Sequence, residues 1–322
     1  MKELRIWQEL QADLKIVESE LLRQIETCDP IIRQAAYQLA KAGGKRLRPA
    51  FTILAAKSCG ATLKQVLPLA VAAEMVHMTT LIHDDIIDAS PLRRGQPTLW
   101  VRWGKELSLH AGDYLFARSL KLIAVYDKTS IPSILASVSV KIVQGEINQL
   151  SAAYNINVTF REYLDRICRK TALLIAACCQ TGAIAAGAKD EYVRSLYHYG
   201  RNLGIAFQIT DDVLDMNASQ EYLGKPVGSD LRQGVITLPA MYALKVCSCK
   251  DKLASLLTKR DKNEQEIKEI IEIIQDCGGI DYALKLAKRY LERARQRVEI
   301  LPPSKARDAL ISLTYYVKSR EH

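Results

Sequence analysis

The chain is poor in the residues that mark fibrous, disordered and low-complexity proteins. Only 16 glycines and 10 prolines occur among its 322 residues, and 7% of the residues are aromatic, whereas 48% are hydrophobic. This composition excludes a collagen-like repeat, a disordered chain and a low-complexity array. A chain of this length and apolar content can build a large globular core.

No segment has the character of a secretory signal or a membrane span. Residues 1–10 (MKELRIWQEL) are charged and amphipathic, unlike the apolar stretch of a signal peptide. The longest uncharged stretch, residues 171–188, contains Gln180 and Thr181 and falls short of the ~20 apolar residues that a transmembrane helix needs. We therefore expect a soluble, cytoplasmic protein.

The cysteines lack the spacing of a metal site. There is no CxxC pair, and the two close pairs, Cys178–Cys179 and Cys247–Cys249, have no histidine partner near them in sequence. We interpret the cysteines as small buried hydrophobic residues of a protein in a reducing compartment. The eight are Cys28, Cys59, Cys168, Cys178, Cys179, Cys247, Cys249 and Cys277.

Positive charge is in excess. The 45 lysines and arginines outnumber the 36 aspartates and glutamates, which gives a net charge of +9. This balance indicates an anionic partner, which is a nucleic acid, a membrane surface or a phosphorylated small molecule. Charge alone does not choose among the three.

Helical periodicity runs through most of the chain. Trp7, Leu10, Leu14, Val17 and Leu21 recur at intervals of three and four, with charged residues between them. Strand signals are nearly absent, because no alternating β-branched run lasts beyond four or five positions. Similar helical stripes cover residues 66–88, 107–126, 134–150, 160–186, 193–215, 237–246 and 283–300.

Short segments of glycine and proline separate these stripes, and no Ser/Gly-rich linker divides the chain. The breakers lie at residues 29–30, 43–44, 90–91, 95–97, 224–226 and 301–303. The sequence therefore predicts one all-α domain over residues 1–322, with ten or more mostly antiparallel helices.

Two acidic motifs end apolar helical stripes. Both have the pattern DDxxD, in HDDIID at residues 83–88 and TDDVLD at residues 210–215. In a helix, residues four apart share a face, so Asp84 lies above Asp88 and Asp211 above Asp215. Such paired carboxylates repel one another unless a cation is present. Hard oxygen donors without cysteine or histidine favour Mg²⁺, with Mn²⁺ as a substitute.

Basic residues lie beside glycines before and after the two acidic motifs. GGKRLRP at residues 43–49 carries three cations beside flexible backbone; Arg93 and Arg94 follow the first motif, and Lys225 follows the second. Arginine and lysine side chains bind phosphate oxygens. The combination of acids and bases predicts a ligand with diphosphate groups, held by metal-bridged carboxylates and by cationic donors.

These motifs resemble those of the trans-isoprenyl (polyprenyl) diphosphate synthases, in the family's order and over nearly the whole chain. The resemblance is closest to medium- and long-chain members such as the heptaprenyl diphosphate synthase catalytic component. It implies an isoprenoid-synthase-type helical bundle around a large central cavity. The matching segments are GGKRLRP (43–49), HDDIID (83–88), RRG (93–95), GE (145–146), KT (170–171), FQITDDVLD (207–215), GKPVGSDL (224–231) and TLP (237–239).

The resemblance implies a Mg²⁺-dependent condensation of isopentenyl diphosphate with an allylic prenyl diphosphate. It implies that Asp84, Asp88, Asp211 and Asp215 are metal ligands, that Asp85 and Asp212 support them, and that the catalytic set also includes Lys170. The implied contacts of the allylic diphosphate are Arg93, Lys170, Thr171, Gln208 and Lys225. Those of isopentenyl diphosphate are Lys45, Arg48, His77 and Arg94. His77 also precedes Asp84 by two helical turns on nearly the same face.

One position departs from the family pattern. The family commonly has GKxTLP, whereas this chain has Val235 in place of the lysine.

The residues before Asp84 predict the product length. Val76, Thr79 and Thr80 lie where a bulky side chain would block a growing product, and none of them is aromatic. About 31 Å of helix between Leu63 and Asp84 accommodates roughly six to eight isoprene units. We expect a C35 product, within about C30–C40, for quinone side chains.

Other interpretations remain at this point. A terpene cyclase shares one DDxxD motif, but its second motif resembles NSE/DTE. A regulatory prenyl-synthase subunit resembles a copy that has lost the aspartates, and a nucleic-acid-binding protein leaves both motifs unexplained. A shorter-chain farnesyl or geranylgeranyl diphosphate synthase, or a catalytic subunit that needs a small partner, fits the motifs. We expect a homodimer that does not bind nucleic acid, with transient membrane contact for product release.

Overall fold

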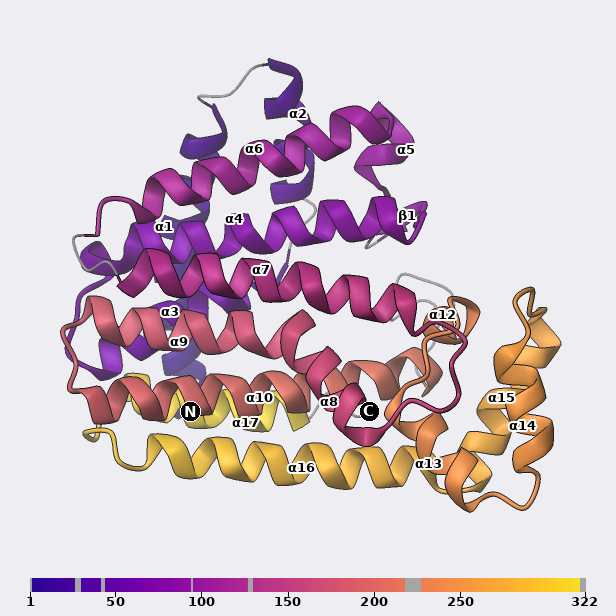
Figure 1. Ribbon diagram of the computed structural model, residues 1–322. Coiled ribbons are helices and arrows are strands. Elements are labelled where there is room, and N and C mark those ends of the chain that lie inside the picture. The colour runs from indigo at the N-terminus through magenta and orange to yellow at the C-terminus, as the bar shows by residue number, and fades with distance from the viewer. Residues whose placement is uncertain are drawn as a thin grey trace. The chain divides into compact units, whose positions relative to one another are not determined.

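The computed structural model describes residues 2–26, 30–41, 44–93, 95–126, 130–217 and 227–318. Over these residues the protein is all-α, as predicted, apart from one two-stranded ribbon that was not predicted (Figure 1). In chain order the elements are α1 (Lys2–Glu26), α2 (Pro30–Lys41), α3 (Leu47–Ser58), α4 (Leu63–Ile87), β1 (Leu92–Arg93), β2 (Gln96–Pro97), α5 (Leu99–Trp103), α6 (Lys105–Ile123), α7 (Ser130–Ser151), α8 (Phe160–Ile167), the π-helix η1 (Cys168–Ala172), α9 (Leu173–Ala185), α10 (Asp190–Asn217), α12 (Ser229–Arg232), α13 (Leu238–Val246), α14 (Lys250–Thr258), α15 (Glu264–Asp276), α16 (Gly279–Val298) and α17 (Lys305–Lys318).

The chain divides into two compact units. Unit 1 comprises Met1–Ser139, Leu174–Gly200 and Arg295–Leu313, and unit 2 comprises Val140–Leu173, Arg201–Ala294 and Thr314–His322. The division falls within α7, α9, α10, α16 and α17, so each of these helices contributes residues to both units.

Helix α4 is the core helix of unit 1, and it ends in the first acidic motif. A capping box begins it, in which the Thr62 amide donates to the Gln65 side chain at 2.8 Å. Most of its following residues are buried on every side, which removes the usual polar face of a helix. Its start at Leu63 agrees with the length used to predict the product.

Two helices are long and apolar enough to span a membrane, against the expectation from the sequence. They are Leu63–Ile87 and Phe160–Ala185, and 67% and 72% of their apolar windows lie buried inside the protein. Their burial identifies them as core helices, within the residues that the structure describes.

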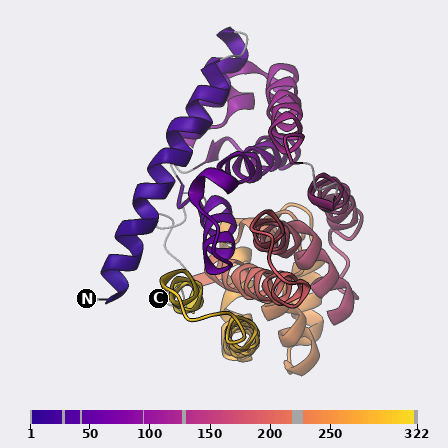
Figure 2. The ribbon, with the colours of Figure 1, turned by 90° about the vertical axis from the view of Figure 1, so that its left-hand side faces the viewer.

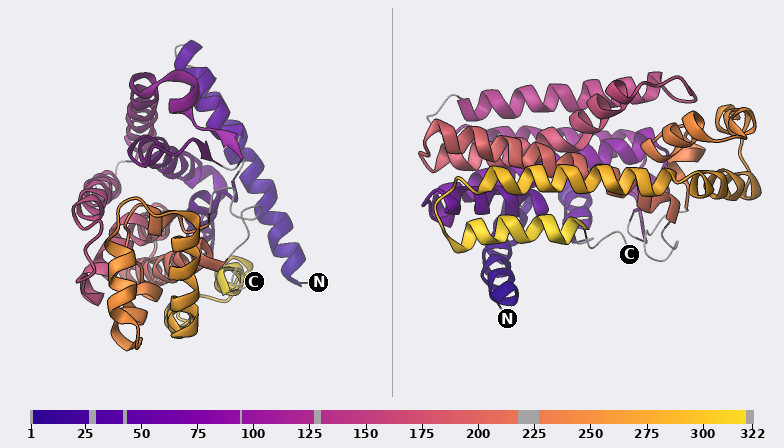
Figure 3. Two further views of the ribbon diagram at one scale, coloured as in Figure 1. Left: turned by 90° about the vertical axis from the view of Figure 1, so that its right-hand side faces the viewer. Right: turned by 90° about the horizontal axis from the view of Figure 1, so that it is seen from below.

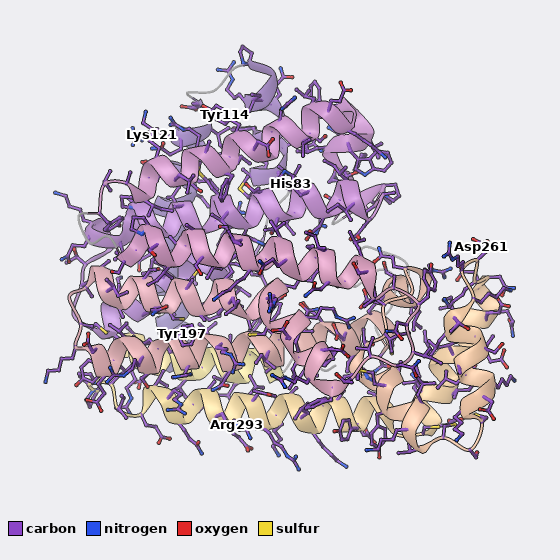
Figure 4. The ribbon with its side chains drawn as sticks, viewed as in Figure 1. His83, Tyr114, Lys121, Tyr197, Asp261 and Arg293 are labelled. Carbon is purple, nitrogen blue, oxygen red and sulfur yellow. The ribbon has the colours of Figure 1, made fainter. Side chains whose placement is uncertain are left out.

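Helices α4 and α6 pack side by side in unit 1 because a glycine allows them to approach (Figure 1). A Cβ atom on Gly112 of α6 would lie 2.4 Å from the His83 Nε2 atom of α4. The Thr79 hydroxyl donates to the Gly112 carbonyl at 3.1 Å. Figure 4 labels His83 on α4 and Tyr114 on the neighbouring α6. The chain-length position Thr79 therefore lies at the contact between these two helices.

Helix α1 runs as a long helix beside α2, α3 and α4 of the same unit (Figure 2). The connection from α2 to α3 contains Arg46, whose φ of 46° lies in the left-handed region. Its buried guanidinium donates to Glu74 of α4 at 2.8 Å and to the Ala40 carbonyl at 2.5 Å. Arg46, one of the three cations in the basic motif, thus pairs with the glutamate that interrupts the apolar stripe of α4.

In unit 2, helix α10 packs closely against the π-helix η1. A Cβ atom on Gly204 of α10 would lie 2.5 Å from the Ala172 Cα atom of η1. Further along the chain, α14 and α15 pack together as a hairpin whose connecting loop contains Asp261 (Figures 3 and 4). The contact at Gly204 fixes η1, which carries Lys170 and Thr171.

Candidate active site

The first acidic motif closes α4. Asp88 is the C-terminal cap of the helix, and its amide donates to the Asp84 carbonyl at 2.8 Å, one turn back. Both side chains are partly exposed, whereas Asp85 is buried. The predicted pairing of Asp84 and Asp88 on one helical face is therefore present in the structure.

Asp85 holds Arg93 instead of facing solvent. The Arg93 Nε atom lies 2.9 Å from both carboxylate oxygens, and its Nη2 atom lies 2.7 Å from Oδ1. Burial raises the pKa of Asp85, and the bonds from Arg93 oppose that rise. This bidentate pair fixes the β1–β2 ribbon that follows the motif. Arg94 lies outside the described residues.

The second acidic motif lies in the last turns of α10. Asp211 is partly exposed, while Asp212 and Asp215 are buried. The Asp215 Oδ2 atom accepts from the Asp230 amide at 3.0 Å, and its carbonyl accepts from the Gly228 amide at 2.7 Å. Asp215 therefore anchors the segment that begins α12. Lys225, just before that segment, lies outside the described residues.

Two neutral donors hold Asp212. The Tyr163 hydroxyl of α8 donates to Oδ2 at 2.7 Å, and the Gln208 amide donates to Oδ1 at 2.9 Å. Burial raises the pKa of Asp212 to about 7, and the nearby Asp230 carboxylate adds to this rise. A bound cation would favour the ionised form and act in the opposite direction.

Lys170 and Thr171 lie within the π-helix η1, a type of turn that is frequent at functional sites. The Lys170 Nζ atom lies 2.9 Å from Glu146 and 3.5 Å from Gln149, both on α7. The Thr171 hydroxyl donates to the Gln208 side chain at 2.6 Å. Gln208 therefore connects Thr171 to Asp212 in one network.

The remaining predicted residues of unit 1 differ in exposure. Lys45 is exposed, Arg48 is partly buried, and His77 is half-buried on α4. Val76 and Thr79 are buried, and Thr80 is half-buried with its hydroxyl on the His77 carbonyl at 2.8 Å. The predicted residues thus fall into two groups: those around Asp84 belong to unit 1, and Lys170, Thr171, Gln208 and the second motif belong to unit 2.

Val235, the departure from the family pattern, is 8% exposed. Its amide donates to the Asp230 carbonyl at 2.8 Å, so its backbone supports the α12 turn that Asp215 anchors. The side chain at this position is therefore part of the packing of unit 2.

The donor set of each motif fits Mg²⁺. Among the described residues, no group of three or more histidines, cysteines, aspartates or glutamates is arranged to hold a metal ion. Mg²⁺ typically takes only one or two carboxylates from a protein and completes its shell with water and substrate phosphates. Paired carboxylates one turn apart meet that requirement, provided that a phosphorylated ligand supplies the remaining oxygens.

Sequence reasoning missed three contributors to these two groups. Tyr163 lies in no motif, and the basic motif that contains Arg46 does not indicate its partner; the partners of Tyr163 and Arg46 lie 49 and 28 residues away in sequence. Glu146 belongs to the GE motif at residues 145–146, to which the sequence alone assigns no role. That motif was the one signal from which the Lys170–Glu146 pair was predictable.

Comparison with known proteins finds a matching family model and similar proteins. The model of the polyprenyl synthetase family matches residues 29–274. A heptaprenyl diphosphate synthase component 2 from Geobacillus stearothermophilus is 42% identical over all of both chains. A geranylgeranyl diphosphate synthase from Methanosarcina mazei is 37% identical over 90% of each.

A solved structure shares the fold along almost the whole chain. A polyprenyl synthase from Caulobacter crescentus, crystallised with calcium and isoprenyl diphosphate, superimposes with a TM-score of 0.95 at 35% identity, over 99% of this chain and 98% of that one. Fold and motifs together define an all-α prenyltransferase of isoprenoid biosynthesis. The chain belongs to the polyprenyl synthetase family and is a trans-polyprenyl diphosphate synthase, whose substrates are prenyl diphosphates.

Proposed function

We propose that the enzyme condenses isopentenyl diphosphate head-to-tail with an allylic prenyl diphosphate in a Mg²⁺-dependent reaction. The observation that carries the proposal is the pair of aspartate motifs, each placing two carboxylates one turn apart at the end of a helix. The bonded network of Thr171, Gln208 and Asp212 supports it.

The residues have distinct roles in this proposal. Asp84, Asp88, Asp211 and Asp215 would hold Mg²⁺, with Mn²⁺ as a substitute. Bound Mg²⁺ supplies positive charge that stabilises the departing diphosphate. Asp85 and Asp212 are supporting residues, since each is tied to neighbouring side chains.

The cationic and polar side chains bind the two substrates. Arg93, Lys170, Thr171, Gln208 and Lys225 bind the allylic diphosphate, and Lys45, Arg48, His77 and Arg94 bind isopentenyl diphosphate. The allylic C–O bond breaks, and the isopentenyl double bond attacks the allylic carbon. A proton is then lost to the released diphosphate. Fixed Lys and Arg donors stabilise that anion without reorganisation during the reaction.

We propose a long product, about C35 within roughly C30–C40, for quinone side chains. None of Val76, Thr79 and Thr80 on α4 is aromatic, and the about 31 Å of this helix between Leu63 and Asp84 fits roughly six to eight isoprene units. The similarity to a heptaprenyl diphosphate synthase component supports this length. A geranylgeranyl product is the alternative, because a synthase of that type is also similar.

We propose a cytoplasmic homodimer with transient membrane contact for product release. The relative named component 2 implies a partner subunit in that enzyme, so a small second subunit here is an alternative assembly. An exposed apolar stripe on α7 supports self-association. It consists of Val140, Val143, Ile147 and Leu150.

The test uses the purified full chain with Mg²⁺, farnesyl diphosphate and labelled isopentenyl diphosphate, and separates the products by reversed-phase chromatography. We expect elongation to about C35, and loss of incorporation with EDTA. No incorporation by the chain alone, restored by a second subunit, would favour the two-component alternative. Products ending at C15 or C20 would contradict the proposed length.

A variant of α4 tests product length directly. Thr79→Phe adds an aromatic ring at the α4–α6 contact, and we expect shorter products. Thr79→Val is the control, because it removes the hydroxyl that binds the Gly112 carbonyl without adding length. An unchanged product distribution in Thr79→Phe would contradict this role for position 79.

A further inference from the structure

Three cysteines meet at the junction of α13, α14 and α15 in unit 2. Cys247 follows α13, Cys249 precedes α14, and Cys277 follows α15. Because α14 and α15 form a hairpin, the start of one and the end of the other lie at the same end, opposite the Asp261 loop (Figures 3 and 4). The fold therefore gathers thiols that lie up to thirty residues apart in sequence.

The exposure of these three thiols differs from the expectation that the cysteines are buried. Cys168, Cys178 and Cys179 are buried, as expected for small hydrophobic residues. Cys247, Cys249 and Cys277 are partly exposed, so that interpretation is wrong for this group. Partial exposure gives a small reagent access to their sulfur atoms.

The Cys247 and Cys249 sulfur atoms are 3.0 Å apart. A disulfide bond is ~2.05 Å long, so closing it requires a movement of about 1 Å within a three-residue connection. The connection between α13 and α14 is not part of either helix, which leaves its backbone able to adjust.

The surroundings of the three sulfur atoms give them different roles. Hydrogen bonds from the Cys249 and Cys277 thiols lower the pKa of Cys247, and the nearby Asp276 carboxylate opposes this effect. The bond to Cys247 raises the pKa of Cys249, while Lys252 lowers it. Burial raises the pKa of Cys277 to about 11. Cys247 therefore carries the thiolate that attacks, because the thiolate is the nucleophilic form.

We propose that Cys247 and Cys249 form a reversible intramolecular disulfide, at a site that reacts with low-molecular-weight disulfides of the glutathione class. The Cys247 thiolate attacks one sulfur of the reagent, whose S–S bond breaks and releases one thiolate. Cys249 loses its proton to solvent and attacks the Cys247 sulfur, releasing the second thiolate. Two protein thiols are oxidised and one small disulfide is reduced to two thiols. Cys277 is a positioning residue that stabilises the Cys247 thiolate.

The test treats the full chain with glutathione disulfide, blocks free thiols with N-ethylmaleimide and analyses tryptic peptides by mass spectrometry. Cleavage after Lys245 and Lys250 gives the peptide VCSCK, residues 246–250, which holds both cysteines. We expect this peptide to lose two hydrogens and to take up no N-ethylmaleimide. Dithiothreitol should restore two alkylation sites.

Two single variants and an internal control locate the chemistry. Cys249→Ser should leave Cys247 trapped as a mixed disulfide with glutathione. Cys277→Ala should move the pH profile of Cys247 alkylation to higher pH, because one donor to the thiolate is lost. Cys59 is also partly exposed, but burial raises its pKa, so it should stay unmodified under the same treatment.

Three results would overturn the proposal. They are full alkylation of the 246–250 peptide after oxidation, a crosslink from Cys247 to the Cys277 peptide in place of the Cys249 bond, and equal oxidation of Cys59.

Discussion

At the scale of single residues, the middle aspartate of each motif is bound by protein side chains. Arg93 holds Asp85, and Tyr163 with Gln208 holds Asp212. The outer aspartates Asp84 and Asp211 are the more exposed members. The middle residues therefore set the orientation of each helix end, while Asp84 and Asp211 are accessible to a cation.

Tyr163→Phe tests this support. The change leaves a buried carboxylate oxygen of Asp212 without its donor, which typically costs about 1–3 kcal/mol. We expect lower stability in urea and a higher Mg²⁺ concentration for half-maximal activity. Tyr199→Phe is the control, since it removes a similar buried bond, to the Leu310 carbonyl at 2.7 Å. An identical Mg²⁺ dependence in the two variants would argue against a role for Tyr163 at the motif.

The buried Arg46–Glu74 pair makes a second prediction. Arg46→Met leaves the Glu74 carboxylate buried without its main partner, and such losses cost about 3–5 kcal/mol. Urea unfolding measures the loss, and the double variant with Glu74→Leu should recover much of it. Arg23→Met, which breaks an exposed pair with Glu20, should cause no measurable change. A small effect of Arg46→Met would show that solvent replaces the pair.

The basic motif illustrates what sequence allows at this scale. GGKRLRP predicts cations beside flexible backbone, and Lys45 is indeed exposed. The pattern does not tell which cation turns inward, because Arg46 is selected by Glu74, on a helix 28 residues away. A role that depends on a partner distant in sequence can be recognised only when the fold is known.

At the scale of elements, α4 and α10 were predictable because their apolar periodicity and the acidic residues at their ends are local features. The π-helix η1 was not, since the residues of 168–172 continue the helical pattern of their neighbours. The π-helix η1 packs closely against α10 because Gly204 has no side chain, which leaves room for Ala172.

Gly204→Ala tests whether η1 positions the allylic diphosphate. The new methyl group overpacks the contact, which typically costs about 1–3 kcal/mol. We expect a raised KM for the allylic substrate, measured in steady-state assays. Gly200→Ala crowds Ala176 of the regular helix α9 and should lower stability while leaving KM unchanged. Equal KM values for both variants would contradict a positioning role of η1.

At the scale of the whole molecule, we propose that the two units form one domain, as predicted from the sequence. Among the described residues, five helices continue from one unit to the other, so neither unit is a contiguous part of the chain. The all-α class followed from periodicity and composition. The apolar stripe of α7 was not recognised from the sequence, because exposed and buried apolar positions look alike until the packing is known.

The α7 stripe predicts the oligomeric state. Val140, Val143, Ile147 and Leu150 are 56–59% exposed at alternating intervals of three and four, the spacing by which paired helices bury a seam. Ile147→Lys should convert a dimer into a monomer, measured by light scattering after size exclusion. Asn148→Lys, one position off the stripe, should stay dimeric. A monomeric parent chain, or a dimeric Ile147→Lys, would contradict a homodimer through α7.

The most direct test of the central claim is the rate of isopentenyl condensation as a function of Mg²⁺ in Asp84→Asn and Asp211→Asn. Each change removes one ligand charge and keeps the side-chain shape, and exposed Asp308→Asn is the control. If both motifs hold the ions that stabilise the leaving diphosphate, each variant loses on the order of 10²-fold or more in kcat/KM and requires more Mg²⁺, while circular dichroism is unchanged. Condensation at the parent rate and the parent Mg²⁺ concentration in either variant would contradict the account.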